Sequence, residues 1–342
     1  MRILVTGATG FVGAVLMPEL IGRYGAASVD AFVLPGDMIP GTWRDAGVRI
    51  FAGDIADAAA VRAAIDGHSH VIHMAGFISY WKGDEENLRK VNEDGARSAV
   101  EACLAAGVER LIHVSSVGAI GFRKDGKPAD ERTPFNWPED ILYMISKRRG
   151  QDIVERAVRE RGLRAIILNP ASIMGPGDHN PATPHNMLYK RICGRNQIGS
   201  FSGGLAIVDV RDLTALILKA LEGRGRDGES YLVVGANLKY SEVVRRISRA
   251  CGRKAYPFPV PAPLLAAAGH VLERISRRTG QKPLLTAAYG RLSGWTAFSD
   301  NAKSRREFDH TYIDADKTIV DGWKYFRDTF VSAGAPSPED GK

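Results

Sequence analysis

The first 170 residues alternate short apolar runs with longer segments in which apolar and polar positions alternate at helical spacing. The apolar runs predict strands at 3–5, 29–34, 48–51, 70–73, 111–114 and 164–168. Apolar positions three or four residues apart predict helices at 14–23, 58–65, 87–106 and 139–161. Because strands and helices alternate with short connections, we expect a parallel sheet with helices on both faces.

The regular alternation weakens after residue 170. A stretch rich in proline and glycine, 175–202, predicts a lid or a pocket wall. Strands at 206–210 and 230–234 and helices at 187–192, 211–221, 241–251 and 263–278 follow. We predict an α/β fold, a doubly wound parallel sheet with a smaller C-terminal substrate lobe. The sheet domain comprises 1–170, with further strands from about 206–234. The substrate lobe comprises 171–205 and 235–330, and a flexible tail follows at 331–342.

A glycine-rich turn follows the first strand directly, with Gly7, Gly10 and Gly13 spaced three apart. This spacing allows a tight turn, close approach of backbone N–H groups to a pyrophosphate, and close packing of the next helix on its strand. A phosphate bound there would lie at the positive N-terminus of that helix. The turn predicts a phosphate site of the Rossmann type, although glycine-rich turns also occur without a ligand.

Composition is ordinary for a globular protein, with 44% hydrophobic and 25% charged residues in 342. No apolar run reaches the roughly 20 residues needed to span a bilayer. The chain enters a strand at Ile3, which leaves no room for a signal peptide. We therefore expect a cytoplasmic protein without a transmembrane segment.

The net charge of +7 does not by itself indicate a nucleic-acid partner, because the basic residues are scattered. Their local clusters at 147–149, 245–246 and 274–278 complete no DNA-binding motif, so no nucleic acid is expected. The three cysteines, Cys103, Cys193 and Cys251, lie far apart and predict neither a metal site nor a disulfide.

The helix predicted at 263–278 carries an apolar stripe. It consists of Leu264, Leu265, Ala268, Val271, Leu272 and Ile275. A core-facing helix of the smaller lobe is the favoured interpretation, because any packed helix needs such a stripe. The alternative is weak association with a membrane surface, since arginines follow the stripe.

Tyr143 and Lys147 stand four residues apart, so on a helix their side chains share one face. We expect the Lys147 ammonium to lower the pKa of Tyr143 from about 10 toward neutrality. Tyr143 could then exchange a proton with a substrate oxygen. Ser116 follows a predicted strand, at the sheet edge where ligands collect, and can orient the same oxygen.

Taken together, these features resemble the extended short-chain dehydrogenase/reductases, the NAD-dependent epimerase/dehydratase superfamily. The resemblance runs from Arg2 to about Phe330. Its motifs are TGATGFVG at 6–13, GDI at 53–55, HMAG at 73–76, VNEDG at 91–95, VSSVGAIG at 114–121, YMISK at 143–147 and NPASIMGPGD at 169–178. Within the superfamily, the segments 169–178, 207–212 and 278–286 resemble the branch of dihydroflavonol reductases, 3β-hydroxysteroid dehydrogenases and hopanoid-associated sugar epimerases.

The resemblance implies an NAD- or NADP-dependent enzyme and a role for each matching residue. Ser116, Tyr143 and Lys147 would be catalytic, and Tyr80 and Asn169 would contact the substrate. The cofactor would contact Gly7, Thr9, Gly10, Phe11, Val12, Gly13, Asp54, Ile55, Ala75, Gly76, Asn92, Tyr143, Lys147, Leu168 and Pro170. No metal ligand is implied.

The end of the second strand departs from the family pattern. Members that prefer NAD usually place an acidic residue there, and this chain has Pro35. Asp37 nearby would favour NAD, whereas Arg44 would favour NADP. The sequence leaves this choice open.

The favoured function is hydride transfer between nicotinamide and a secondary alcohol or ketone of a medium-sized, largely apolar small molecule, such as a steroid, triterpenoid or flavonoid. The alternative is a sugar-nucleotide epimerase or dehydratase with the same catalytic residues, in which cations at 190–195 hold a diphosphate. A non-enzymatic nucleotide sensor is disfavoured, because Tyr143 and Lys147 are both present. A homodimer through the helices that begin near Asn87 and Glu139 is a further alternative.

Overall fold

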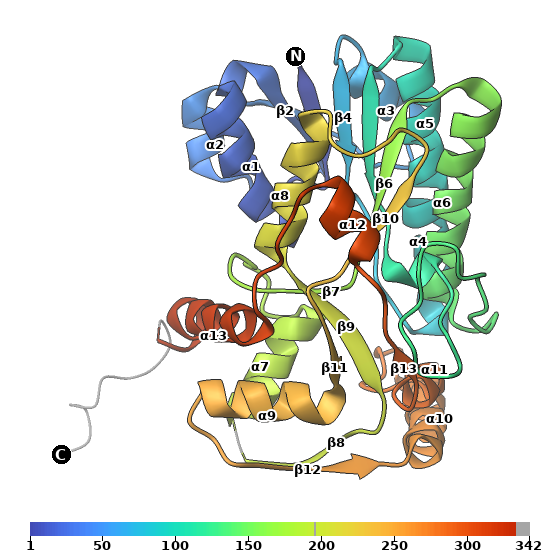
Figure 1. Cartoon of the computed structure of the whole chain (residues 1–342), viewed down its shortest axis with the longest axis vertical. Coiled ribbons are helices and arrows are strands. Elements are labelled where there is room, and N and C mark those ends of the chain that lie inside the picture. Colours follow the sequence, from blue (N-terminus) through green and yellow to red (C-terminus); the bar gives the residue numbers. More distant parts are fainter. Residues whose placement is uncertain (195, 333–342) are drawn as a thin grey trace.

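The computed structural model describes residues 1–194 and 196–332. A seven-stranded sheet forms one end of the molecule and a smaller lobe forms the other (Figure 1). The sheet has the order β10-β6-β5-β4-β1-β2-β3, and all its neighbouring strands are parallel. Its strands are β1 (Ile3–Thr6), β2 (Val29–Val33), β3 (Arg49–Ala52), β4 (His70–His73), β5 (Arg110–Val114), β6 (Ala165–Pro170) and β10 (Ser230–Val233). The strand order reverses between β1 and β4, and in such sheets ligands bind at that crevice.

Helices cover both faces of this sheet, as the sequence predicts. They are α1 (Phe11–Tyr24), α2 (Gly41–Ala46), α3 (Ala58–Ile65), α5 (Gly95–Ala106), α6 (Leu142–Arg161) and α8 (Val210–Leu221). One hydrophobic core contains Leu16 of α1 and Leu213 of α8. A second core on the other face contains Val61, Val100 and Val154 of α3, α5 and α6. The predicted doubly wound architecture is confirmed.

The helix predicted at 87–106 is helical throughout but contains a π-helical turn. It divides into α4 (Glu85–Leu88), a π-helical turn (Arg89–Asp94) and α5. The turn brings the Asn92 side chain over Phe77, whose backbone N–H donates to Asn92 Oδ1 at 2.9 Å and whose carbonyl accepts from Asn92 Nδ2 at 2.9 Å. Such turns often occur at functional sites, and apolar periodicity does not reveal them. The next long helix, α6, begins at Leu142, three residues later than predicted.

The smaller lobe contains two further sheets, one with the order β11-β9-β13 and β7 beside β9, the other pairing β12 with β8. Its strands are β7 (Ser172–Met174), β8 (Gln197–Phe201), β9 (Gly204–Asp209), β11 (Ala236–Lys239), β12 (Ala255–Val260) and β13 (Thr296–Ala297). The helices of this C-terminal part are α7 (Pro184–Gly194), α9 (Tyr240–Ala250), α10 (Ala262–Thr279), α11 (Ala287–Leu292), α12 (Ala302–Glu307) and α13 (Ala315–Phe326). Among them, α12 packs beside β10 of the main sheet.

Of the two strands expected to extend the main sheet from 206–234, only β10 does so. The strand predicted at 206–210 is β9, which pairs with β7, β11 and β13 instead. The prediction was wrong because a buried apolar strand looks alike in either sheet, and only tertiary pairing decides which one it joins. The predicted tail lies outside the described residues from 333 onward.

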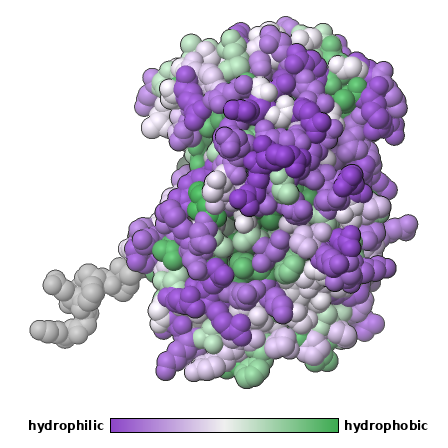
Figure 2. Space-filling view, viewed as in Figure 1, coloured by the Kyte–Doolittle hydropathy of each residue, from purple (hydrophilic) through white to green (hydrophobic). Residues whose placement is uncertain are grey.

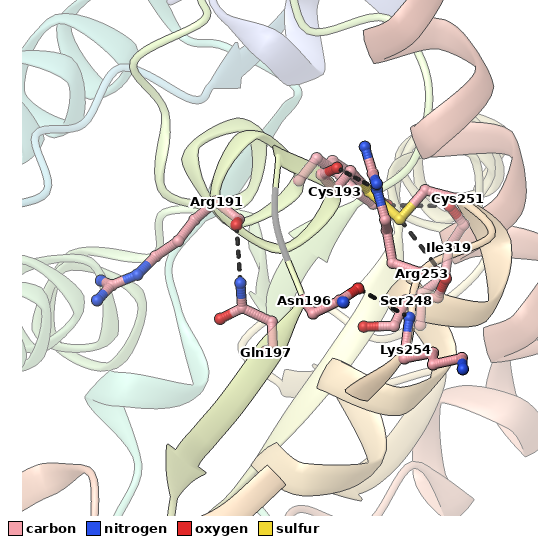
Figure 3. The surroundings of a disulfide bond; sticks show 10 residues. Arg191, Cys193, Asn196, Gln197, Ser248, Cys251, Arg253, Lys254 and Ile319 are labelled. Atoms are coloured by element: carbon pink, nitrogen blue, oxygen red, sulfur yellow. Dashed lines mark hydrogen bonds between the residues drawn. A yellow bond between two sulfur atoms is a disulfide. The ribbon is translucent and has the colours of Figure 1, made fainter. Parts of the chain in front are cut away.

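Cys193 and Cys251 form a disulfide, which the sequence did not predict (Figure 3). Their Cα atoms are 5.8 Å apart, although 58 positions separate them in the chain. The bridge joins the end of α7 to the residue after α9, and Arg253 Nε donates to the Cys193 carbonyl at 3.1 Å. Packing of α7 on α9 through the lobe core creates this proximity, and cysteine spacing carries no sign of it.

Candidate active site

The glycine turn lies between β1 and α1, as the sequence predicts. Gly7 has a φ of +70°, and a Cβ there would lie 2.8 Å from the Ala75 backbone nitrogen. Gly13 must also lack a side chain, because its Cβ would lie 2.0 Å from the Ala8 carbonyl oxygen. Gly10 is the N-cap of α1, and within the described chain no side chain caps this helix. Its first N–H groups are thus available to an anion, so the turn fits the pyrophosphate of a dinucleotide.

The residues around the turn hold the crevice between β1 and β4 in place. The Thr6 hydroxyl accepts from the Met74 backbone N–H at 3.2 Å, which joins the carboxyl ends of the two strands. Thr9 donates its hydroxyl proton to Asp37 Oδ2 at 2.5 Å. Asp37 therefore lies against the glycine turn at the end of β2. The Phe11 ring stacks on His185 of α7, with ring centroids 4.7 Å apart.

Other predicted cofactor residues surround the same crevice. Asp54 accepts from the Ala56 N–H at 3.0 Å and pairs with Lys90 at 2.7 Å, and these bonds lower the pKa of its carboxyl group. Ile55 is buried and packs against Gly95. The remaining positions divide by exposure: Val12 and Ala75 are partly exposed, Gly76 is exposed, and Asn92, Leu168 and Pro170 are buried. Their contacts with a cofactor stay predictions.

The structure brings Ser116, Tyr143 and Lys147 together. Ser116 follows β5, and its hydroxyl accepts from the Gly118 N–H at 3.0 Å and lies close enough to Tyr143 to lower the pKa of that phenol. Tyr143 and Lys147 occupy one buried face of α6. The Lys147 ammonium donates to the Val114 carbonyl at 3.3 Å.

Burial dominates the electrostatics of these groups. It raises the pKa of Tyr143 above its usual value, and the Ser116 hydrogen bond offsets this only in part. Burial also lowers the pKa of Lys147 to about 8. The predicted lowering of the Tyr143 pKa by Lys147 is therefore wrong for the protein alone, because removal from water disfavours both charged forms. Tyr143 is therefore protonated at neutral pH.

Two histidines lie beneath the lysine and carry no charge. His73 ends β4 and His113 lies beside it in β5, with ring centroids 5.2 Å apart. Burial lowers the pKa of His73 to about 3 and that of His113 well below its usual value. Lys147 is thus the one cation of this cluster at neutral pH.

Asn169, predicted to contact substrate, lies in a buried hydrogen-bond network. Its Nδ2 donates to the Ser116 carbonyl at 2.8 Å and to Gln151 Oε1 at 2.7 Å. Ser115 Oγ donates to the same Gln151 oxygen at 2.8 Å. The network holds the end of β5, and a substrate contact for Asn169 stays a prediction. The sequence analysis missed Gln151, although it lies four residues after Lys147 on the same helix face.

Aromatic rings from four separate segments lead away from Tyr143. Tyr80 lies 5.7 Å from Tyr143 and 5.0 Å from Tyr289 of α11 between ring centroids. Phe201 of β8 lies 5.7 Å from Tyr289 and 5.1 Å from Tyr240 of α9. Tyr80, Tyr289, Phe201 and Tyr240, here called the aromatic wall, are all partly exposed. Sequence reasoning named Tyr80 and included Phe201 in the predicted pocket wall at 175–202, but no motif indicates Tyr240 or Tyr289.

The described cations assigned to a sugar diphosphate lie on α7, the helix whose His185 stacks on Phe11. Lys190 and Arg191 are exposed on α7, whose Tyr189 and Ile192 are buried, and residue 195 lies outside the described part of the chain. In the described ranges, no group of three or more His, Cys, Asp or Glu side chains could hold a metal ion. No helix in those ranges is long and apolar enough to cross a membrane.

Known proteins resemble this chain over most of its length. A model of the NAD dependent epimerase/dehydratase family matches residues 3–234. Sterol demethylase protein B of Methylococcus capsulatus is 29% identical over 331 residues, covering 96% of this chain and 99% of that protein. Ceramide reductase of Caulobacter vibrioides is 26% identical over 345 residues, covering 97% and 95%. The crystal structure of gox2253 has a TM-score of 0.80 and 31% identity, covering 96% of this chain and 98% of that one.

Proposed function

Because the chain belongs to the NAD-dependent epimerase/dehydratase family, we propose that it is an NAD(P)-dependent oxidoreductase acting on a ketone or secondary alcohol of a largely apolar molecule. A steroid, a triterpenoid or a flavonoid has the size and polarity that we propose. The observation that carries this proposal is the aromatic wall beside Tyr143. Two relatives whose names refer to a sterol and to ceramide support an apolar substrate.

The geometry favours Tyr143 as the proton donor in ketone reduction. The hydroxyls of Ser116 and Tyr143 are neighbours and together can hold a carbonyl oxygen. When bound, the nicotinamide supplies the hydride to the carbonyl carbon. Tyr143 gives its proton to the oxygen, so the ketone becomes an alcohol and the phenol becomes a phenolate. The Lys147 ammonium on the same helix face stabilises that phenolate.

We propose NAD as the preferred dinucleotide. Asp37 lies at the end of β2 against the glycine turn, where its carboxylate accepts from Thr9 and from the Leu34 N–H at 3.2 Å. An anion at this position suits a ribose hydroxyl and repels a 2′-phosphate. Arg44, the residue that would favour NADP, is exposed on α2. Turnover rates measured with NADH and with NADPH at the same concentration test this preference, and the rate with NADH should be higher.

A substrate screen tests the proposed reaction. Purified protein should oxidise NADH or NADPH with ketones of steroid, triterpenoid or flavonoid skeletons, and the Tyr143→Phe variant should not. Failure of all three skeletons to support turnover would refute the proposal. Interconversion of a UDP-sugar and its epimer without net NADH would instead support the sugar-nucleotide alternative.

The cytoplasmic location and the homodimer through α5 and α6 stay predictions, and the molar mass in solution tests the dimer.

A further inference from the structure

Three large apolar side chains of the helix α10 face away from the protein, whereas Leu265 and Leu272 are partly buried. Leu264, Val271 and Ile275 are 63%, 55% and 51% exposed. Their spacing of seven and four residues places them in one stripe. The buried face of the helix contains only small side chains, namely Ala266, Gly269 and Ser276. The favoured prediction of a core-facing stripe is therefore wrong for these three large residues.

Close packing against α11 explains why the small residues face inward. A Cβ on Gly269 would lie 2.5 Å from the Ala287 nitrogen. In the opposite direction, a Cβ on Gly290 of α11 would lie 2.6 Å from the Ala266 nitrogen. The two helices thus touch backbone to backbone, and this contact has no room for a leucine or an isoleucine. The outer stripe cannot be buried by a rotation of α10.

The apolar surface continues beyond the helix. The strands β8 and β12 lie with α10 at the end of the molecule opposite the main sheet (Figure 1). Their exposed side chains include Ile198, Tyr256 and Phe258, and Leu284 is exposed after α10. Apolar groups are visible along this lower edge in the space-filling view (Figure 2). Large exposed apolar side chains gathered at one end of a molecule are typical of an interaction site. We call the outer side of α10 together with these residues the α10 face.

Positive charge accompanies the apolar stripe. Arg274, Arg277 and Arg278 are exposed in the last two turns of α10. None of the three has an ion pair or hydrogen bond with another described residue. The carboxylate of Glu273 turns inward, where Glu273 Oε1 accepts from the Ala287 N–H at 3.1 Å. The partner of this face must therefore offer apolar groups and negative charge together.

We propose that the α10 face docks on the surface of an anionic lipid bilayer. A helix with outward apolar residues and adjacent arginines lies in the headgroup region, where apolar side chains enter the acyl boundary and cations meet lipid phosphates. A second copy would bring no outward carboxylate from α10 to pair with these arginines, because Glu273 turns inward. Charge complementarity therefore selects the bilayer over self-association.

Docking also brings the proposed active site near a source of apolar substrate. Tyr289 of the aromatic wall belongs to α11, the helix that packs on α10. A substrate leaving the bilayer would thus have a short path to Tyr143. This part rests on the proposed function, whereas vesicle binding needs no substrate and tests docking alone.

Co-sedimentation with vesicles tests the proposal. The full chain should bind vesicles of equal phosphatidylcholine and phosphatidylglycerol, and bind phosphatidylcholine vesicles far less. The double variant Val271→Asp/Ile275→Asp should lower the partition coefficient roughly tenfold or more, because it puts carboxylates into the contact. Val331→Asp is the matched control, since Val331 is also exposed but lies after α13. This control should bind as the wild type does.

A second pair of variants separates charge from apolar contact. Arg274→Gln/Arg278→Gln should weaken binding to anionic vesicles and reduce its dependence on salt concentration. Wild-type protein that stays in the supernatant with anionic vesicles would overturn the proposal. So would unchanged binding by Val271→Asp/Ile275→Asp. If that variant instead turned a wild-type dimer into a monomer without altering vesicle binding, the face would be a contact between copies.

Discussion

Lys147 destabilises the fold at neutral pH, because its charge is buried. Its only hydrogen bond to the described chain is to the Val114 carbonyl, and no described carboxylate pairs with it. Burial lowers its pKa from 10.5 to about 8. In the unfolded chain the pKa returns to its usual value, so the unfolded state binds more protons between these two pH values. The stability of the protein must then rise with pH across that window.

The difference between the two pKa values sets the size of the effect. A lowering from 10.5 to about 8 corresponds to about 3 kcal/mol of unfavourable free energy when the lysine is charged. The full cost is present below pH 8, and it disappears as the pH rises to about 10.5. Methionine has a similar length and no charge. Lys147→Met should therefore raise the free energy of unfolding by up to about 3 kcal/mol at pH 7 and abolish turnover.

Urea unfolding followed by circular dichroism at pH 7 and pH 10 measures this effect. The quantity of interest is the stability of Lys147→Met minus that of the wild type at each pH, because other titrating groups cancel in it. Lys124→Met is the control, since Lys124 is exposed in the loop before α6. Its change in stability should stay within about 0.5 kcal/mol at both pH values.

Two results would refute this reasoning. Lys147→Met could prove no more stable than the wild type at pH 7, which would mean that the ammonium is well solvated in the folded protein. Alternatively, the stability difference between variant and wild type could stay constant from pH 7 to pH 10. Titration of Lys147 would then not be the source of the effect.

Three further predictions address the site and the lobe. Tyr143→Phe should lower kcat at least about 100-fold while the Kd for NADH, from fluorescence titration, stays within about threefold. Burial lowers the pKa of His73 to about 3, so the neutral histidine costs no stability above pH 6.5, but the protein loses stability as the pH falls below that value. Between pH 7.5 and pH 5 the wild type should lose about 2 kcal/mol of unfolding free energy through His73, and His73→Asn should remove this part of the loss. The control His270→Asn should not remove it, because His270 is exposed. Cys193→Ser should lower the free energy of unfolding by about 2–4 kcal/mol, and a reductant should do the same to the wild type but not to the variant.

Local spacing predicted the parts of the site that depend on neighbouring residues. Gly7 and Gly13 act within one turn, and Tyr143 and Lys147 share a buried face because they are four residues apart on α6. The alternation of strands and helices likewise gave the doubly wound sheet. Such features depend on backbone geometry, which repeats at fixed intervals along the chain.

The features that the sequence did not predict depend on tertiary packing. Tyr289 belongs to the aromatic wall only because α11 packs beside Tyr80, more than 200 positions away. The Cys193–Cys251 bridge needs the contact of α7 with α9. The outward stripe of α10 shows the same limit. Periodicity finds an apolar face, but only the close contact at Gly269 determines that the small residues, and not the large ones, face inward.

One physical cause, removal of water, connects the catalytic residues with the proposed substrate. Burial keeps Tyr143 protonated, lowers the pKa of Lys147 and keeps His73 neutral. A pocket that admits an apolar ring system must exclude water in the same way. A phenolate at Tyr143 is then stable only beside a cation, and Lys147 is the charge that this cluster offers. The proposed substrate follows from the same cause, because the aromatic wall beside Tyr143 offers apolar contacts to a ketone.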